Sequence, residues 1–105
     1  MASSKEYLNF IIDQLAGLTG VTYRAMMGEY VIYCCGKVIG GIYDDRFLVK
    51  PTRSALEMMH DAQREIPYEG AKEMLLADPV DDREFLCGLI RAIYEDLPEP
   101  KEKKK

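Results

Sequence analysis

Hydrophobic residues recur at helical spacing near the start of the chain. The apolar positions are Leu8, Ile11, Ile12, Leu15 and Leu18. They fall on one side of a helix with 3.6 residues per turn, so the pattern predicts an amphipathic helix. Ser3 and Glu6 fit a capping box, in which each side chain accepts a hydrogen bond from the backbone amide of the other residue. Gly17 and Gly20 are expected to end this helix.

A second helical stripe lies near the end of the chain. Its apolar positions are Phe85, Leu86, Leu89, Ile90, Ile93 and Leu97. Asp81 and Asp82 precede the stripe, where acidic side chains face the positive end of the helix dipole. Pro98 and Pro100 cannot continue a helix, so we expect the helix to end before them.

The residues between these two helices have a different character. From Val21 to Lys50 the chain is rich in β-branched and aromatic residues, and glycines or aspartates interrupt it at regular intervals. This pattern predicts strands joined by hairpins. The expected strands cover about residues 21–27, 29–35, 37–43 and 46–50.

The segment that follows the strands is less regular. Pro51 ends the last strand, and Thr52 is a suitable cap for a helix over about 53–62. A loop is expected over 66–70. Residues 72–77 fit either a short helix or an edge strand, and we favour the strand.

The hairpin turns predict which side chains share a face of the sheet. A two-residue turn at Asp44-Asp45 sets Ile42 opposite Phe47 and Gly40 opposite Val49. With the preceding turn centred on Gly36, a first face carries Tyr30, Ile32, Cys34, Val38, Gly40, Ile42, Phe47 and Val49. The second face then carries Glu29, Val31, Tyr33, Cys35, Ile39, Gly41, Tyr43, Arg46, Leu48 and Lys50. The first face is almost entirely apolar, so we expect the helices to cover it.

These elements predict an α+β domain in two layers. A mainly antiparallel sheet of about four to five strands is packed on its apolar face by the N- and C-terminal helices. At 105 residues the chain has room for one core, and its 48% hydrophobic and 30% charged content is ordinary for a globular protein. We expect one domain over residues 1–100 and a disordered lysine-rich tail over 101–105.

The charge of the chain argues against binding to duplex DNA. Four of the 14 basic residues and one of the 18 acidic residues lie in the last five positions, which leaves 10 basic against 17 acidic and a net charge of −7 in residues 1–100. Phosphate backbones would repel such a body. The chain has no apolar run of about 20 residues for a membrane span and no signal-peptide pattern, and its three cysteines are an odd number. We therefore expect a cytoplasmic protein with no membrane contact.

The residues with chemical potential do not form a catalytic or metal-binding pattern. Cys34 and Cys35 are adjacent on a strand and point to opposite faces, and neither has a CxxC spacing. Cys87 lies at the margin of the last helical stripe, and all three thiols are interpreted as packing residues. Cys35 is the most exposed to oxidation if the second face is open.

Histidine and the acidic pairs also favour structural roles. His60, the only histidine, is expected at a solvated helix end and has no nucleophile in its sequence pattern. Asp44-Asp45 fits a tight turn and Asp81-Asp82 a helix start. The sequence therefore predicts no catalytic residue, no cofactor, no metal and no enzymatic activity.

Several short motifs resemble one known family. Arg24-Ala25-Met26-Met27-Gly28 resembles the Arg-x-Met-Phe-Gly opening of the TfoX/Sxy N-terminal domain. The run 33–42 is similar to the tyrosine–Gly–Lys hairpin of that family, 47–50 to its next strand and 66–68 to its proline–aromatic loop. The resemblance covers about residues 5–97. Met27 stands where the family usually has Phe, and Glu29-Tyr30 replaces a glycine-richer continuation.

The resemblance implies an α+β domain that regulates through protein contacts. Full-length competence regulators of this family carry a second, C-terminal domain, so the expectation here is a stand-alone N-terminal domain. We expect a non-enzymatic regulatory or adaptor role with another protein, or a second copy of the chain, as the partner. The alternative is a small-ligand site on the tyrosine-rich second face.

The expected contact surface is the second face of the sheet. Its residues are too apolar to face water alone, and patches of this kind commonly mark interfaces. The predicted contact residues are Arg24, Val31, Tyr33, Cys35, Ile39, Tyr43 and Leu48.

Overall fold

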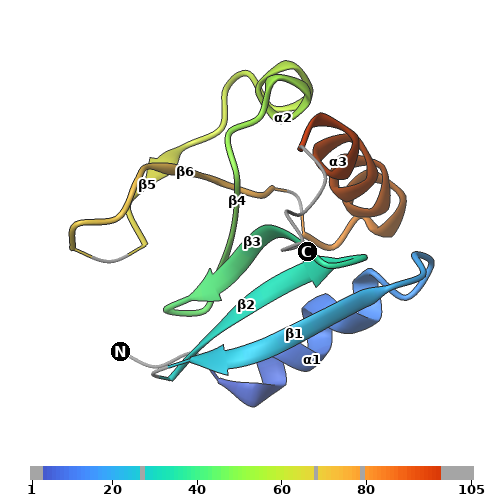
Figure 1. Ribbon diagram of the computed structural model, residues 1–105, viewed down its shortest axis with the longest axis vertical. Helices are drawn as coiled ribbons and strands as arrows, with labels where there is room; N and C mark the ends of the chain where they lie inside the picture. The colour runs from blue at the N-terminus through green and yellow to red at the C-terminus, as the bar shows by residue number, and fades with distance from the viewer. Residues whose placement is uncertain (1–3, 27, 68, 79, 98–105) are drawn as a thin grey trace, which may run out of the picture.

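One curved antiparallel sheet and two longer helices make up most of the protein (Figure 1). The structure, a computed structural model, describes residues 4–26, 28–67, 69–78 and 80–97. The elements are α1 (Lys5–Gln14), β1 (Val21–Met26), β2 (Glu29–Cys34), β3 (Lys37–Tyr43), β4 (Arg46–Val49), α2 (Arg53–Met58), β5 (Arg64–Glu65), β6 (Met74–Leu76) and α3 (Arg83–Asp96).

The sheet order is β1-β2-β3-β4-β6-β5, and every neighbouring pair is antiparallel. The predicted α+β class, the antiparallel sheet and the two packed helices are therefore confirmed. The described residues hold six strands, more than the predicted four to five. The favoured strand within 72–77 is present as β6, whereas the two-residue β5 is too short to give an alternating pattern.

Some predicted features lie outside the described residues. They are the Ser3 cap, Met27, Tyr68, Pro98, Pro100 and the tail 101–105. The cap of α1 is Ser4, whose hydroxyl accepts a hydrogen bond from the Tyr7 amide at 3.1 Å. Glu6 is therefore one position too early to complete a capping box, and that part of the prediction is wrong.

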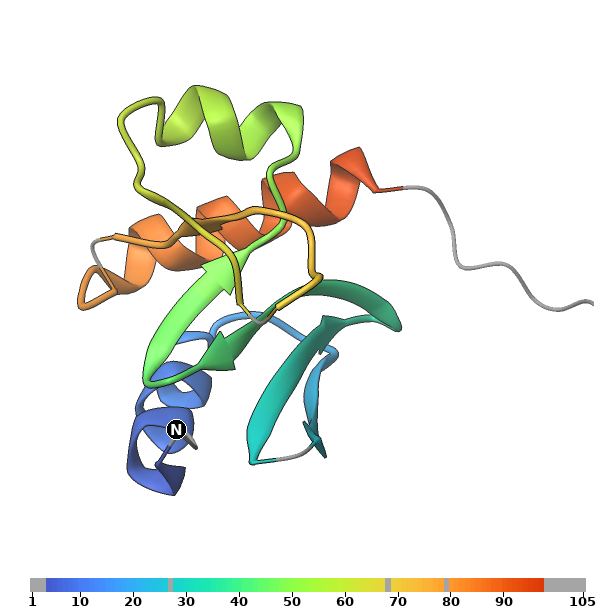
Figure 2. The same ribbon diagram turned by 90° about the vertical axis from the view of Figure 1, so that its left-hand side faces the viewer.

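Side-chain caps begin the other two helices. Thr52 Oγ1 accepts from the Ala55 amide at 3.3 Å, so the predicted cap of α2 is confirmed, although α2 ends at Met58 instead of 62. Asp82 Oδ1 accepts from the Phe85 amide at 3.0 Å at the start of α3. α2 lies alongside α3 on the side away from α1 (Figure 2).

The core lies between the first face of the sheet and the stripes of α1 and α3. The fully buried stripe residues are Leu8 and Ile11 of α1, Leu15 at its C-cap, and Leu86, Leu89, Ile90 and Ile93 of α3. They pack in one cluster with Ile32, Ile42, Phe47 and Val49. Because both helical stripes were visible as apolar positions at helical spacing, this part of the fold follows directly from the sequence.

The hairpin between β3 and β4 has the predicted register. Ile42 pairs with Phe47 and Gly40 pairs with Val49. Asp44 and Asp45 both adopt positive φ angles, 54° and 57°. Two successive positive φ angles are typical of the tight hairpin turns that aspartate tolerates.

The hairpin between β2 and β3 differs from the prediction. Its turn is Cys35-Gly36, both with positive φ, and Cys34 pairs with Lys37. The register then shifts between Ile32 and Tyr33, because β3 holds an extra residue, Ile39, at a β-bulge.

The bulge changes the face on which two residues lie. Val38 pairs with Tyr33 and lies on the second face, whereas Ile39 is fully buried in the main core. The predicted positions of Val38 and Ile39 are therefore wrong. Without the extra residue Ile39 and Ile42 would point to opposite faces, so the bulge allows both to be buried together.

Lys37 also lies on the core side of the sheet. Its Nζ donates to the backbone oxygens of Tyr94 at 3.2 Å and Leu97 at 2.9 Å, and it lies 4.1 Å from the centre of the Tyr94 ring. A cation at this place satisfies carbonyl groups at the end of α3 and favours the negative end of its dipole. Lys37 thus connects the β2–β3 hairpin to the C-terminal end of α3 through hydrogen bonds.

Candidate interaction surface

The structure separates the seven residues of the predicted contact surface. Arg24, Val31, Tyr33, Tyr43 and Leu48 share the second face, as the strand pairing requires. Cys35 lies in the β2–β3 turn and Ile39 belongs to the core. The predicted surface therefore retains five of its members on one face.

One cross-strand row shows how the second face changes in exposure. Arg24 of β1 pairs with Val31 of β2, Val31 with Gly41 of β3, Gly41 with Leu48 of β4, and Leu48 with Leu76 of β6. Arg24 is exposed, Val31 is 8% exposed and Leu48 is fully buried. The second face is thus open at β1 and closed toward β4.

Two features bury the closed part of the second face. The ring of Tyr43, which is 8% exposed, lies against Gly41, because a Cβ atom at Gly41 would be 2.7 Å from its Cε2. The segment between β5 and β6 faces β3 across a groove, and Arg46 of β4 forms a 2.5 Å ion pair with Glu65 of β5. The expectation that Val31, Tyr43 and Leu48 lie on an open apolar face is therefore wrong.

The open end of the second face lies on β1 and β2. All residues of β1 after Val21 are exposed. Met26, on the second face, is 46% exposed, and Tyr23, which pairs with Ile32 and so lies on the first face, is 44% exposed. Thr22, Tyr23, Arg24, Tyr33 and Gly36 line a shallow hollow of about 360 Å³ here. Two predicted contact residues, Arg24 and Tyr33, thus remain together at an accessible place. We call Thr22, Arg24, Met26 and Tyr33 the β1 surface.

A groove lies over the closed part of the second face. It has a volume of about 550 Å³, and Val38, Gly40, Tyr43, Lys50, Pro51, Thr52, Pro67, Ala71, Lys72, Glu73 and Met74 line it. Lys50, directly after β4, and Lys72, between β5 and β6, come from segments that are far apart in sequence. With Glu73 also in the lining, the groove carries two basic side chains and one acidic side chain, a balance that favours an anion. Neither Lys50 nor Lys72 was among the predicted contact residues, because their presence in one groove depends on the position of the segment between β5 and β6.

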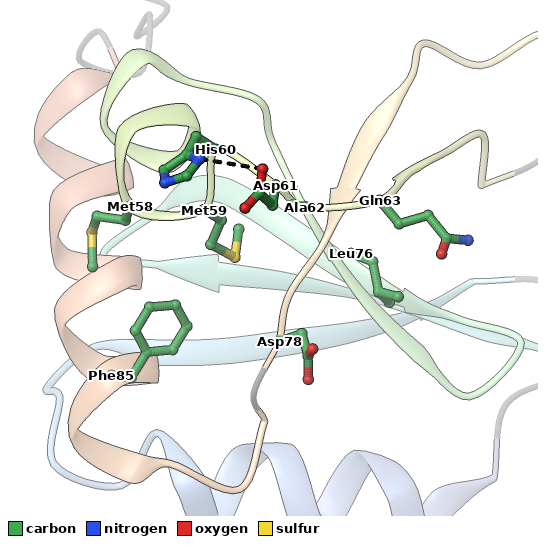
Figure 3. A pocket seen from close by; sticks show the side chains of 9 residues that line it. All are labelled: Met58, Met59, His60, Asp61, Ala62, Gln63, Leu76, Asp78 and Phe85. Carbon is green, nitrogen blue, oxygen red and sulfur yellow. Dashed lines mark ion pairs between the residues drawn. The ribbon is translucent and has the colours of Figure 1, made fainter.

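A third hollow, of about 470 Å³, lies between the end of α2, β6 and the start of α3 (Figure 3). His60 Nδ1 lies 3.3 Å from Asp61 Oδ1, and both side chains are largely exposed. Asp78 lies away from this pair, and Met58, Met59 and Phe85 supply apolar walls. The lining residues include no serine, threonine, cysteine or lysine, so the His60–Asp61 pair has no nucleophile to activate there.

The three free cysteines lie in different environments: Cys34 is buried, Cys87 is half-buried and Cys35 is exposed. Burial raises the pKa of the Cys34 thiol, with a smaller contribution from neighbouring Cys35. Cys35 is exposed, and its sulfur lies 3.7 Å from the Thr19 carbonyl oxygen. Across the described ranges, no group of three or more His, Cys, Asp or Glu side chains could hold a metal ion. In the same ranges no helix has the length and apolar character needed to cross a membrane.

The sequence reasoning missed the importance of β1 as an edge. β1 is paired on one side only, and its position at the end of the sheet follows from the strand order. The local pattern of β1 does not differ from that of a central strand, so pairing order was not readable from it.

Comparison with known proteins gives two matches. The family model described as TfoX N-terminal domain matches residues 13–96. A relative from Spirochaeta aurantia, an uncharacterized 12.7 kDa protein in the trpE 5′ region, is 35% identical over 105 residues, which cover 99% of this chain and 91% of that protein. No solved structure matches the chain.

Proposed function

Because the chain belongs to the TfoX N-terminal domain family, we propose that it is a non-enzymatic regulatory domain that acts by binding another protein. The family model and the relative both match nearly the whole fold of this chain, including β1 and β2, the two strands that carry the β1 surface. Regulation is the role that the resemblance to competence regulators implies. The binding of a protein is our own extension of that role.

The exposure of the β1 surface is the observation that carries the proposal. Arg24 and Met26 project from the second face beside the partly exposed Tyr33. Arginine, tyrosine and methionine are enriched at protein interfaces, because each combines a large apolar area with a polar or adaptable end. A surface of this composition supports contact with a protein whose matching side is apolar with an acidic group.

The chemistry of the hollows supports a role without catalysis. The hollow beside His60 offers an exposed ion pair, and the groove over Tyr43 offers two lysines and one glutamate. An acid–base catalyst needs a nucleophile or substrate group held in a fixed, partly buried geometry beside the base. Neither hollow supplies that arrangement from its lining residues.

Affinity capture with matched variants tests the proposal. The wild type, an Arg24→Glu/Met26→Ser variant and a Phe10→Ser variant are used as baits in extracts of the native cell. Phe10 is an exposed apolar residue of α1, so its replacement controls for non-specific adhesion. We expect one partner to bind the wild type and the Phe10 variant, with at least a tenfold loss for the Arg24/Met26 variant. Equal recovery by all three baits would contradict the proposal.

A small anionic ligand in the groove is the second candidate function. Its supporting observation is that Lys50 and Lys72 line one groove with the ring of Tyr43. Thermal unfolding with a panel of small phosphates and carboxylates tests it. Stabilisation that disappears in a Lys50→Met/Lys72→Met variant would favour this function over protein contact.

A further inference from the structure

The outer edge of β1 carries backbone groups at alternate residues. In an antiparallel ladder, every second residue directs both its N–H and its C=O toward the neighbouring strand, and the residues between direct theirs away. The Cys35 amide donates to the Gly20 oxygen at 2.8 Å, which fixes Gly20 as a residue that faces β2. Thr22, Arg24 and Met26 therefore face β2 as well, whereas Val21, Tyr23 and Ala25 face outward.

No described residue pairs with these outward groups. β1 ends the sheet order, and its only strand neighbour is β2. Proteins usually protect such an edge with proline, an inward-pointing charge, a bulge or a covering segment. Between Val21 and Met26 there is no proline, the pairing with β2 is regular, and the one charged side chain, Arg24, projects from the second face.

The spacing of the outward groups makes the edge complementary to itself. Two copies of an antiparallel strand related by a two-fold axis place one residue opposite its own copy. With Tyr23 on the axis, Val21 pairs with Ala25 of the second copy and Ala25 with Val21. All three outward residues are then used, and the edge gains about six hydrogen bonds.

The side chains favour this register over its nearest alternative. With Tyr23 on the axis, Arg24 lies opposite Thr22 of the second copy, so no like charges face each other directly. An axis at Arg24 would place the two guanidinium groups opposite each other, which is unfavourable. The two Tyr23 residues would be neighbours across the axis, and their neighbours on the same face, Val21 and Ala25, have smaller side chains. Within each copy, the Tyr23 ring already packs edge-on against the Tyr30 ring, with 5.9 Å between the ring centres.

We propose that β1 binds β1 of a second copy of this chain, in an antiparallel register centred on Tyr23, to form one continuous sheet. This inference extends the proposed function by naming one partner. It also joins the second faces of two copies, so that the two β1 surfaces become neighbours on one larger surface. A different protein that binds the β1 surface would then contact two copies of it related by a two-fold axis.

Sedimentation equilibrium of the full chain tests the proposed pairing. We expect a monomer–dimer equilibrium for the wild type and for Phe10→Ala, and a shift of at least tenfold toward the monomer for Ala25→Pro. The Ala25 amide faces outward, so proline at this position removes no hydrogen bond to β2. Unfolding in denaturant checks that Ala25→Pro remains folded.

Disulfide formation gives a second test that does not depend on the proline variant. In a Cys35→Ser background, Tyr23→Cys would place two Cα atoms about 5.5 Å apart across the axis, within the range of a disulfide. Ala25→Cys, on the same face, would place them about 14 Å apart. Under mild oxidation we expect a covalent dimer for Tyr23→Cys and little for Ala25→Cys.

Three results would overturn the inference. They are a wild-type monomer at high concentration, a dimer that Ala25→Pro leaves intact, and equal oxidation of the two cysteine variants. Each of these leaves the proposed function untouched, because capture of a heterologous partner through Arg24 and Met26 is measured separately. Conversely, a confirmed dimer with no captured partner would contradict the proposed function alone.

Discussion

Gly41 provides the space that the ring of Tyr43 occupies. A Cβ atom at Gly41 would lie 2.7 Å from both Cε2 of Tyr43 and the backbone oxygen of Tyr30. The absent side chain allows the ring of Tyr43, which is 8% exposed, to pack against Gly41. A tyrosine that looks like an interface residue in the sequence is therefore part of the protein's own packing.

Tyr43→Ser should destabilise the protein, whereas Tyr33→Ser should not. Tyr43 is 8% exposed, so its loss removes buried apolar area and leaves a cavity that costs about 2–4 kcal/mol. Tyr33 is partly exposed and its replacement should cost less than about 1 kcal/mol. Equilibrium unfolding in urea measures both values. Similar midpoints for the two variants would show that Tyr43 is not packed as described.

Ile90→Ala should lower the free energy of unfolding by about 2–5 kcal/mol. Ile90 is fully buried between α3 and the sheet, so the change removes apolar contacts and opens a cavity. Arg91→Ala, at the exposed neighbouring position, is the matched control and should have little effect. A loss below about 0.5 kcal/mol for Ile90→Ala would show that Ile90 does not lie on the buried face of α3.

Acid should weaken the attachment of α2 to α3. The Ser54 amide donates to Asp96 Oδ2 at 2.7 Å, and this hydrogen bond holds the pKa of the Asp96 carboxyl below its usual range. Because the pKa is lower in the folded chain, the stabilisation is present above the unfolded pKa of about 3.9 and is lost as the pH falls through the folded value.

Asp96→Asn isolates this effect, because it keeps an oxygen acceptor and removes the charge. The difference in unfolding free energy between the wild type and Asp96→Asn should be largest at neutral pH and should shrink in acid below the folded pKa. Urea unfolding of both proteins across this range is the measurement. A difference independent of pH would mean that the Asp96 charge does not contribute.

Ordinary duplex DNA should not bind the protein at physiological salt. The net charge of −7 in residues 1–100 offers too little phosphate neutralisation. Fluorescence anisotropy of a labelled duplex measures the affinity, with a chain lacking residues 101–105 as the control for the basic tail. Tight binding by the shortened chain would contradict the charge argument.

Local patterns in the sequence were sufficient for the helices and the main hairpins. Most of the predicted stripe residues of the two helices are fully buried, while Ile12, Leu18, Phe85 and Leu97 are half-buried. Asp44-Asp45 sets the β3–β4 register because both residues tolerate positive φ. These features depend on residues near one another in the chain. Periodicity and turn chemistry therefore carry enough information to predict them.

The contact surface was harder to predict, because its exposure depends on distant segments. Ile39 changes face through a bulge, which a regular alternation of side chains does not reveal. Leu48 is buried although it lies on the second face, and it pairs with Leu76 of β6, a strand that comes from far along the chain. Arg24 remains exposed because β1 is the edge of the sheet, and edge position is a property of the strand order.

The most direct test of the account compares gene-replacement strains of the native organism. One strain lacks the protein, one carries Arg24→Glu/Met26→Ser and one carries Lys50→Met/Lys72→Met, with each variant present at the wild-type level. If the protein regulates through its β1 surface, the transcript profile of the Arg24/Met26 strain should match that of the deletion, while the Lys50/Lys72 strain should match the wild type. The reverse pattern, with the groove variant matching the deletion, would contradict this account and favour a small ligand.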